Sequence, residues 1–584
     1  MLKPEGVSPF SRPPAVRLGD LLVGRSVFLI LLAIFTASMP SQPSVLDGEV
    51  EFQTTSALAR EGTHAIGGTP EAEALIAESL RRQSNGQPPF NLMQGEGDAW
   101  YSWFGVGQAY LGVPFYLAGS LVSPLFPEID EAHSEVAHQG VHRTEFFEHL
   151  AVAWRNPLLS ALTGLLVVLT SRRLGASRKN AWLAGLTYGL CTFAWPQARS
   201  TLNMVQATFF LFLSFHLIVV VEERLFRYRR PGTWPLVLCG LSLGAAFLTR
   251  SLTAPVLVVL GIALLFVLWR GSKHHGERVR FLDLVLFAAP ALALFGVFLW
   301  SNQLRFGDPL EQGYSEAVSF EGYFNYPVHH GLAGLLLSPG RGLLWLAPGV
   351  LLFLPWAWRQ LKLRELRVPL LVLGVAAAVL VPVSMTVGWH GAWCYGPRYA
   401  LPLLPFLWLA VGPMLDRLAD DTRWRPAAWL LLGFGTLTSV PGVLVDTTTH
   451  TALAVEAARI EWPDLEGGAE TQEEERFQRI LWDLRFAPPW AHWRMLRHRI
   501  AIEDEEFPLT TLFFVTDDRT GIEEEQRVAT LSPTEARDRG FAHNAWVDFA
   551  QRIGAPIWPI VILCLLLFFG GCLLALKGLD PDQA

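Results

Sequence analysis

The chain has 584 residues, of which 51% are hydrophobic and only 17% charged, and its mean hydropathy is +0.31. Soluble domains carry more charge and less apolar content, so this composition excludes an ordinary soluble protein. The net charge of -7 is modest, and no basic stripe with interleaved aromatic residues indicates nucleic acid as a partner. The five cysteines lie in or beside apolar segments without a Cys-x-x-Cys pair, which disfavours a disulfide framework or a zinc site.

Apolar segments long enough to cross a hydrocarbon core recur along the chain. The first, Ser26–Ala37, follows several basic residues, and we favour a retained spanning helix over a cleaved signal peptide. The clearest of the others are Met204–Val221, Trp234–Leu248, Ala254–Trp269, Phe281–Trp300, Val368–Val387 and Ile557–Leu576. The sequence therefore predicts an all-α polytopic membrane protein with about 12 transmembrane helices.

Basic residues gather in every second gap between the apolar segments, and positive residues in short loops mark the cytoplasmic side. The clusters are Arg172, Arg173, Arg178 and Lys179; Arg224, Arg227, Arg229 and Arg230; Lys273, Arg278 and Arg280; Arg359, Lys362, Arg364 and Arg367; and Arg417, Arg423 and Arg425. This pattern predicts a multi-pass protein of the cell (plasma or inner) membrane with a cytoplasmic N-terminus.

If the basic N-terminus and the cluster at Arg172 are both inside, counting the membrane crossings between them requires residues 41–155 to begin and end outside. The moderately apolar run Trp103–Phe126 then cannot be a simple span, and its prolines and glycines favour interfacial or re-entrant helices. The alternative is a true span combined with an inverted first helix. We expect a transmembrane domain over 1–445 that includes the first outside loop 41–155, an extracytoplasmic loop or small domain over 446–555, and a last helix with a short cytoplasmic tail over 556–584.

An acidic motif, Asp47-Gly48-Glu49 with Glu51 close behind, follows the first helix on the outside face. A carboxylate at the membrane surface can deprotonate an acceptor hydroxyl or hold a divalent cation beside a phosphate leaving group. In a turn or an extended segment, Asp47 and Glu49 could act as base and metal ligand. The alternative is a solvated loop, where acidic residues are common.

Three arginines are predicted on the same outside face. Arg398 opens a spanning segment after Trp389, His390, Trp393 and Tyr395, and an arginine at membrane depth is costly unless it is paired. The alternative for this stretch is an interfacial aromatic belt with a snorkelling arginine.

The other two arginines flank apolar segments. Arg341 lies in Ser338-Pro339-Gly340-Arg341-Gly342, which breaks an apolar stretch and makes Arg341 a candidate phosphate clamp or part of an ordinary loop. Arg250 ends another apolar segment. It is either a partner for the phosphate or an ordinary charge at the end of a helix. The first-loop histidines have no clear metal spacing, and we expect them to be solvated: His64, His133, His138, His142 and His149.

These pieces together resemble the GT-C superfamily of membrane glycosyltransferases, in the group of protein O-mannosyltransferase-like and aminoarabinose-transferase-like proteins. The motifs that carry the resemblance span residues 47 to 399: Asp47-Gly48-Glu49, Tyr101-Ser102-Trp103, Gly107-Gln108, Pro114-Phe115-Tyr116, Ser338-Pro339-Gly340-Arg341-Gly342 and Tyr395-Gly396-Pro397-Arg398-Tyr399. The resemblance implies a polyprenyl-phosphate-linked sugar donor, an acceptor on the outer face and a catalytic first-loop aspartate, which Asp47 fits best. The acidic motif departs from the family's adjacent Asp-Glu, and loop one has no Lys-Pro-Pro segment.

We therefore expect an inverting sugar transfer to a protein, lipid or glycan acceptor, with membrane lipid around the donor. Asp47 is the expected base, and Glu49 is expected to assist it or to hold a metal such as Mg²⁺ or Mn²⁺. The expected phosphate and donor ligands are Arg250, Arg341, Arg398, Trp389, His390, Trp393 and Tyr395. The rival functions are a transporter or flippase for a lipid-linked sugar, which needs the arginines but no base, and a non-catalytic membrane scaffold.

Overall fold

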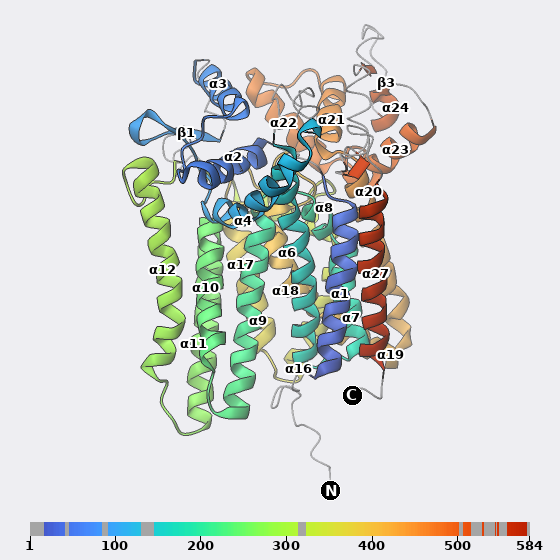
Figure 1. The fold of residues 1–584 in the computed structure, drawn as a ribbon. Coiled ribbons are helices and arrows are strands. Elements are labelled where there is room, and N and C mark those ends of the chain that lie inside the picture. Colours follow the sequence, from blue (N-terminus) through green and yellow to red (C-terminus); the bar gives the residue numbers. More distant parts are fainter. Residues whose placement is uncertain are drawn as a thin grey trace.

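The computed structural model is a bundle of long helices with a cap of shorter elements at one end (Figure 1). It describes residues 17–40, 46–84, 91–129, 145–313, 323–501, 506–514, 528–530, 544, 546–547 and 557–580. The all-α polytopic class predicted from the apolar segments is confirmed, since the strands in these residues form two short pairs and the rest of the architecture is helical.

Eight helical segments in the described residues are long and apolar enough to cross a membrane, and a bent pair raises the count to nine. The eight are Leu18–Ala37 (α1), Phe146–Arg173 (α6), Met204–Tyr228 (α9), Ser251–His274 (η4 and α11), Phe281–Phe306 (α12), Arg367–Ser384 (α17), Thr422–Leu444 (η7 and α20) and Trp558–Leu579 (α27). The bent pair is Arg398–Trp408 (η6 and α18) with Val411–Ala419 in α19 (Val411–Asp420).

The expected count of about 12 spans is not confirmed. The remaining bundle helices are shorter: α7 (Arg178–Leu190), α8 (Ala194–Ala198), α10 (Thr233–Thr249), α14 (Val328–Leu337), α15 (Leu343–Leu346), η5 (Pro348–Leu352) and α16 (Phe353–Lys362). Prolines and glycines interrupt several of them, so their lengths fall below that of a straight span.

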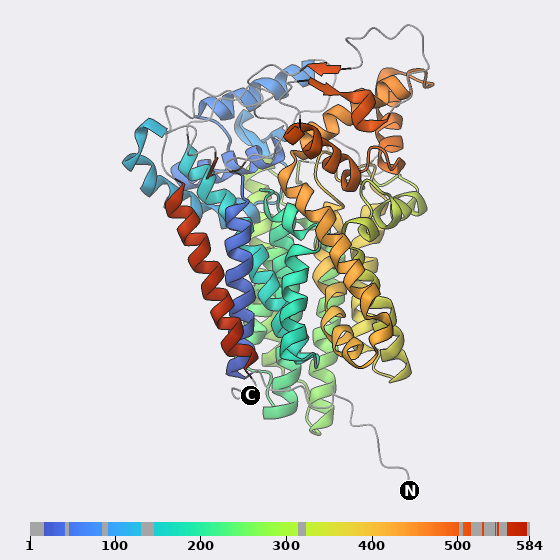
Figure 2. The same cartoon turned by 90° about the vertical axis from the view of Figure 1, so that its right-hand side faces the viewer.

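The first and last spanning helices lie side by side in opposite directions (Figure 2). Gly571 and Gly578 of α27 allow close contact, because a Cβ at Gly571 would lie 3.0 Å from the Ser26 carbonyl oxygen of α1. At the far end of the bundle from the cap, the buried Asp20 carboxylate of α1 accepts from Arg172 Nε at 2.7 Å and from Arg178 Nε at 3.0 Å. These contacts fix α1 against α6, α7 and α27.

The segment between α1 and α6, which we predict to be the first outside loop, begins and ends at the cap. Its elements are α2 (Leu46–Glu61), α3 (Pro70–Ser84), β1 (Leu92–Gln94), η2 (Glu96–Asp98), β2 (Trp100–Ser102), α4 (Gly107–Val122) and η3 (Ser123–Leu125). In β1 and β2, Met93 pairs with Tyr101 in antiparallel register.

Helix α4 lies within the run Trp103–Phe126, which the count of membrane crossings excludes as a simple span. It is not among the candidate spans, and it reaches from the end of α10 to the start of α6 (Figure 1). Two glycines permit these close approaches: a Cβ at Gly107 would lie 2.6 Å from the Thr249 nitrogen, and one at Gly119 would lie 2.5 Å from the Phe147 carbonyl oxygen. Helix α4 therefore ties two distant spans together at the cap.

The second part of the cap follows α20. It contains α21 (Thr447–Glu461), α22 (Ala469–Trp482), α23 (Pro488–Ala501), β3 (Glu506–Pro508), α24 (Leu509–Phe513) and β4 (Val528–Thr530). Its helices share a small hydrophobic core that includes Leu453, Phe486 and Phe513. The acidic runs Glu503–Glu505 and Glu523–Glu525 lie outside the described residues.

We predict that the cap faces the outside of the cell. Ser84 is the last residue of α3 in the cap, and Thr422 begins η7, which follows α19 at the opposite end of the bundle (Figure 1); both residues are exposed. In a variant without the native cysteines, we expect Ser84→Cys to react with a membrane-impermeant maleimide in intact cells. Thr422→Cys should react only after permeabilisation. The reverse pattern would invert the topology, and labelling of both positions in intact cells would contradict the structure.

Candidate active site

Asp47 lies in the first turn of α2 and faces the bundle. Its Oδ1 accepts a hydrogen bond from Asn91 Nδ2 at 2.8 Å, and its Oδ2 lies 3.3 Å from Arg398 Nη1. The Asp47 side chain is 26% exposed and that of Arg398 is 11% exposed. The structure thus brings the predicted base and one predicted phosphate ligand into direct contact across 351 residues of sequence.

Arg398 begins η6 and is held from several sides. Its Nη2 donates to the Tyr399 hydroxyl at 3.0 Å, and its Nη1 also lies 3.4 Å from Cys394 Sγ. Its Nε is buried and has no hydrogen-bond partner among the described residues. Gly391, at φ +75°, makes room for this side chain, because a Cβ there would lie 2.8 Å from Arg398 Cγ.

Tyr399 joins two of the predicted arginines. The Cζ of Arg250, which follows the last residue of α10, lies 4.7 Å from the Tyr399 ring centroid, and the Cζ of Arg398 lies 4.9 Å from it. Burial raises the pKa of nearby Tyr323, and the charges of Arg250 and Arg398 oppose that shift. Two guanidinium groups therefore share one aromatic ring beside Asp47.

Arg341 lies in the break between α14 and α15, as the Ser-Pro-Gly motif predicts. Two carbonyl groups hold it: Gly340 O in the break accepts from Nη1 at 3.2 Å, and Ala392 O in the segment between α17 and η6 accepts from Nη2 at 2.9 Å. Burial lowers the pKa of Arg341 to about 10, so it is cationic at neutral pH. Arg398 contributes to this lowering by repulsion, which means that the two cations act on one another.

The aromatic residues of the same segment do not form one pocket wall. Trp389 is buried against Gly334, and His390 is buried against Phe477 with a ring distance of 4.8 Å. The structure places the Tyr395 hydroxyl 2.6 Å from the Thr438 carbonyl oxygen and leaves Trp393 44% exposed. Burial and the charges of Arg341 and Arg398 lower the pKa of His390 to about 3, so it is neutral.

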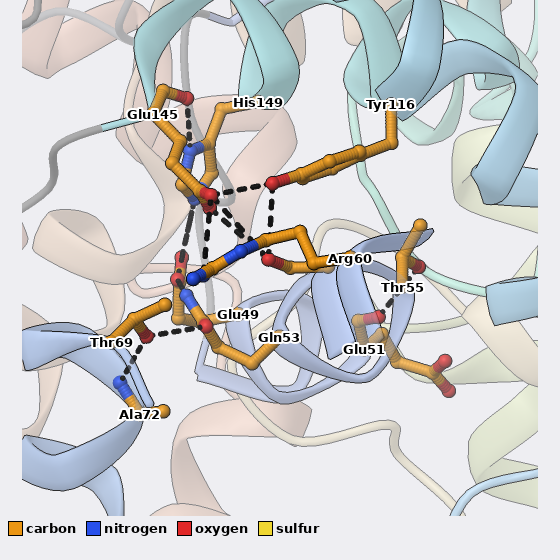
Figure 3. Close-up of polar contacts among 11 residues, drawn as sticks. Glu49, Glu51, Gln53, Thr55, Arg60, Thr69, Ala72, Tyr116, Glu145 and His149 are labelled. Carbon is orange, nitrogen blue, oxygen red and sulfur yellow. Dashed lines mark hydrogen bonds and ion pairs between the residues drawn. The ribbon is translucent and has the colours of Figure 1, made fainter. Parts of the chain in front are cut away.

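Glu49 occupies a different face of α2 from Asp47, because two residues advance a helix by about 200°. It is fully buried, accepts from Gln53 Nε2 at 2.9 Å, and lies 3.3 Å from His149 Nε2 (Figure 3). The His149 ring also stacks on Phe52 at 3.4 Å between centroids. Glu49 thus joins α2 to the start of α6, and its expected role as assistant or metal ligand stays a prediction.

The network continues at the start of α6 (Figure 3). The Tyr116 hydroxyl of α4 donates to Glu145 Oε1 at 2.6 Å, and the Ser56 hydroxyl lies 3.2 Å from the Tyr116 oxygen. Arg60 lies 3.9 Å from the same Glu145 oxygen. Burial and the Glu145 carboxylate raise the pKa of Tyr116, so it remains a hydrogen-bond donor. These contacts lock α2, α4 and α6 together.

The prediction that the loop histidines are solvated is wrong for two of them. His149 is 2% exposed in the Glu49 contact, and His64 is 6% exposed with its Nε2 2.7 Å from the Tyr110 hydroxyl. Burial lowers the pKa of His64 to about 4. His133, His138 and His142 lie outside the described residues. Docking of the loop on the bundle buries these rings, and the local sequence carries no sign of it.

Glu51 is the carboxyl that shares a helix face with Asp47, since the two are four residues apart on α2. Sequence reasoning singled out Glu49 because it treated the motif as a turn or an extended segment. Glu51 is 4% exposed, and burial raises its pKa to about 8. Once residues 46–61 are known to form a helix, the four-residue spacing alone places Glu51 and Asp47 on the same face.

The residues around Asp47 do not fit a metal centre. Both Asp47 oxygens are engaged, by Asn91 and by the cation Arg398. Among the described residues, no three His, Cys, Asp or Glu side chains lie close enough together to hold a metal ion. A metal shared by Asp47 and Glu49 would need them on one face of α2.

Comparison with known proteins supports the class of protein that the fold and the site define. Residues 138–300 match the family model of dolichyl-phosphate-mannose-protein mannosyltransferases. The match covers α6 to α12, which include Arg250 and the start of α6 against which Glu49 packs. The resemblance to membrane glycosyltransferases is confirmed, and with it the predicted enzyme class, a glycosyltransferase.

Two solved structures are similar to this chain at low identity. ArnT from Cupriavidus metallidurans bound to undecaprenyl phosphate has 15% identity and a TM-score of 0.40, with 94% of this chain and 75% of that chain covered. The Archaeoglobus fulgidus oligosaccharyltransferase in complex with Zn and sulfate has 12% identity and a TM-score of 0.39, with 81% and 60% covered. No curated protein sequence matches the chain.

We predict that Arg398 contributes more to the site than its neighbour Arg250. Arg398→Ala removes the partner of Asp47 and one cation of the Tyr399 pair, so we expect a loss of glycosyl transfer by at least about 100-fold. Arg250→Ala leaves the Asp47 contact intact and should cost less. Steady-state transfer by both variants in membranes, at equal expression, measures the difference. Equal losses would show that the Asp47 contact adds nothing.

Proposed function

We propose that the protein transfers a sugar from a polyprenyl-phosphate carrier to an acceptor at the outer membrane face, with Asp47 as the base. The observation that carries the proposal is the contact between Asp47 and Arg398, with Arg250 on the shared Tyr399 ring. A carboxylate beside several cations provides both a proton acceptor and a site for a phosphate leaving group.

The contact also suggests how the site responds to its donor. Without a donor, Asp47 compensates the charge of Arg398 at the end of a spanning segment. A donor phosphate can take over the guanidinium groups, which bind phosphate in a bidentate manner. The Asp47 carboxylate is then released to face the acceptor.

Transfer follows as a single displacement. The acceptor oxygen or nitrogen attacks the anomeric carbon, and its proton passes to the Asp47 carboxylate. The bond from the anomeric carbon to the phosphate oxygen breaks, and polyprenyl phosphate leaves with that electron pair. Arg398, Arg250 and Arg341 stabilise the negative charge that the phosphate gains. Attack from the side opposite the leaving group inverts the anomeric configuration.

The lipid carrier is proposed from the position of the site and from the family match. Asp47 lies on α2 of the cap and contacts Arg398 at the start of the segment formed by η6 and α18, so a donor anchored in the membrane reaches this contact without leaving it. The matched family is named for a lipid-phosphate sugar donor. The acceptor is a hydroxyl or amide group of a protein, lipid or glycan that approaches from the cap side.

We predict that Asp47→Asn reduces transfer by about 100-fold to 10,000-fold, the usual contribution of a general base. The substitution keeps the shape and the Asn91 contact but removes the proton acceptor. The measurement is transfer of radiolabelled sugar from polyprenyl phosphate in isolated membranes. Asp98→Asn is the matched control, because Asp98 is the exposed last residue of η2 at φ +58°, which asparagine tolerates.

Equal transfer by wild type and Asp47→Asn would remove Asp47 as the base. Movement of the labelled lipid-linked sugar across the membrane without transfer, in both proteins, would favour the transporter. Binding of a partner through residues 446–555 without any transfer would favour the scaffold.

Metal dependence is a separate prediction. Because the groups around Asp47 do not fit a metal centre, we expect EDTA to leave transfer unchanged in washed membranes. Loss of transfer that Mn²⁺ or Mg²⁺ restores in wild type, but not in Glu49→Gln, would instead establish Glu49 as a metal ligand.

A further inference from the structure

A small, largely enclosed cavity lies between α2, α4, α6 and the segment before α9, and Gly48, the neighbour of Asp47 in the sequence, is part of its lining. It is about the size of one water molecule, and its lining includes Glu51 and Thr55 of α2, Gln108 of α4, Arg155 of α6 and Thr201. Figure 3 shows that the Glu51 carboxyl points away from Glu49, although His149, the partner of Glu49, is also part of the cavity lining.

Three oxygen atoms of the cavity lining lack a hydrogen-bond partner among the described residues: Glu51 Oε1, Gln108 Oε1 and Thr201 Oγ1. Each residue is at least 96% buried. Gln108 is oriented by its Nε2, which donates to the Thr201 carbonyl oxygen at 2.6 Å, so its Oε1 must act as an acceptor. Buried oxygens without partners are destabilising, and a buried water typically makes about three hydrogen bonds.

The charge of the lining argues against a cation as the occupant. Arg155 is buried in the same wall, and its Nη1 donates to the Gln108 carbonyl oxygen at 2.9 Å. A guanidinium in contact with the cavity repels a metal ion or an ammonium group. Water meets all three oxygens without a charge penalty.

We propose that Glu51, Gln108 and Thr201 bind one internal water, and that Glu51 acts in this site as a neutral carboxylic acid that positions Asp47. This inference rests on the proposed function of Asp47. The Glu51 hydroxyl donates to the water, and the water donates to Gln108 Oε1 and Thr201 Oγ1. The water thereby ties the face of α2 that carries Asp47 to α4 and to the segment before α9.

The surroundings of Glu51 favour its neutral form. Burial raises its pKa to about 8, opposed by Arg155 of α6 and Arg305 of α12, and Asp47 of its own helix raises it further. His149 of α6 also lines the cavity. At neutral pH, Asp47 is therefore the charged member of the Asp47–Glu51 pair. An ionised Glu51 one turn away would repel both the Asp47 carboxylate and a donor phosphate.

The test compares substitutions of Glu51 across a pH series. Glu51→Gln keeps the size and a donor group, so we expect transfer at pH 7 to persist. Glu51→Ala should lower transfer by up to about 100-fold, the cost of a misplaced reactive group. Thr201→Val, which removes one water partner at constant shape, should fall between them. In wild type, transfer should decline above pH 8, and Glu51→Gln should lack that decline.

Glu78→Gln is the matched control, because Glu78 is a solvent-accessible acid on α3 in contact with Arg81. It should leave the pH profile unchanged. A loss in Glu51→Gln equal to that in Glu51→Ala would overturn the proposal, as would an alkaline decline that persists in Glu51→Gln.

A second measurement does not depend on transfer and separates this inference from the proposed function. Between pH 4.5, the ordinary pKa, and about 8, the unfolded chain has lost the Glu51 proton while the folded protein retains it. The unfolding free energy of wild type therefore falls with rising pH across this window, relative to Glu51→Gln, and the difference then stays constant. Thermal unfolding of the purified proteins reports this shift. If the melting temperatures of wild type and Glu51→Gln differed by the same amount at every pH, a neutral Glu51 would be refuted even if transfer is established.

Discussion

The position of an arginine at the outer end of a spanning segment is the constraint on which the rest of the site depends. Arg398 is nearly buried, and a cation at this depth is stable only with a counter-charge. That counter-charge, Asp47, comes from a helix that precedes it by 351 residues. The first outside loop must therefore dock on the bundle in one orientation. Its docking is visible in the close approach of Gly107 to α10 and of Gly119 to α6.

Helix α2 carries Glu49, which anchors the helix, and Asp47, the proposed base, on different faces. Glu49 faces the start of α6, where His149 and Gln53 hold it, and Asp47 faces the arginines. In the proposed reaction, the anchoring face holds the helix in position, so the Asp47 carboxylate has only to exchange its Arg398 contact for the acceptor when the donor binds. Positioning of this kind lowers the reorganisation that the reaction needs, which is the main way a site without covalent chemistry accelerates transfer.

The sequence was sufficient for the features that depend on local pattern. Apolar length predicts the spanning helices, and Ser-Pro-Gly predicts the break beside Arg341. The direction that the basic clusters predict stays a prediction. Features that depend on docking could not be predicted in this way. Helix α2 is polar overall, so its pattern does not reveal that Glu51, and not Glu49, lies beneath Asp47. The burial of His64 and His149 has the same origin, as does the outward position of Trp393.

The low number of straight spans among the described residues and the location of the site have one physical cause. Uninterrupted helices such as α9 and α11 satisfy their backbone groups internally and offer nothing to a ligand. The interrupted segments around residues 338–342 and 391–398 are too broken to count as simple spans, yet they supply the carbonyl oxygens of Gly340 and Ala392 that hold Arg341. Such breaks persist inside a bundle only where other groups satisfy the freed backbone. Departures from regular helix in this protein therefore mark the place where it gathers its cations.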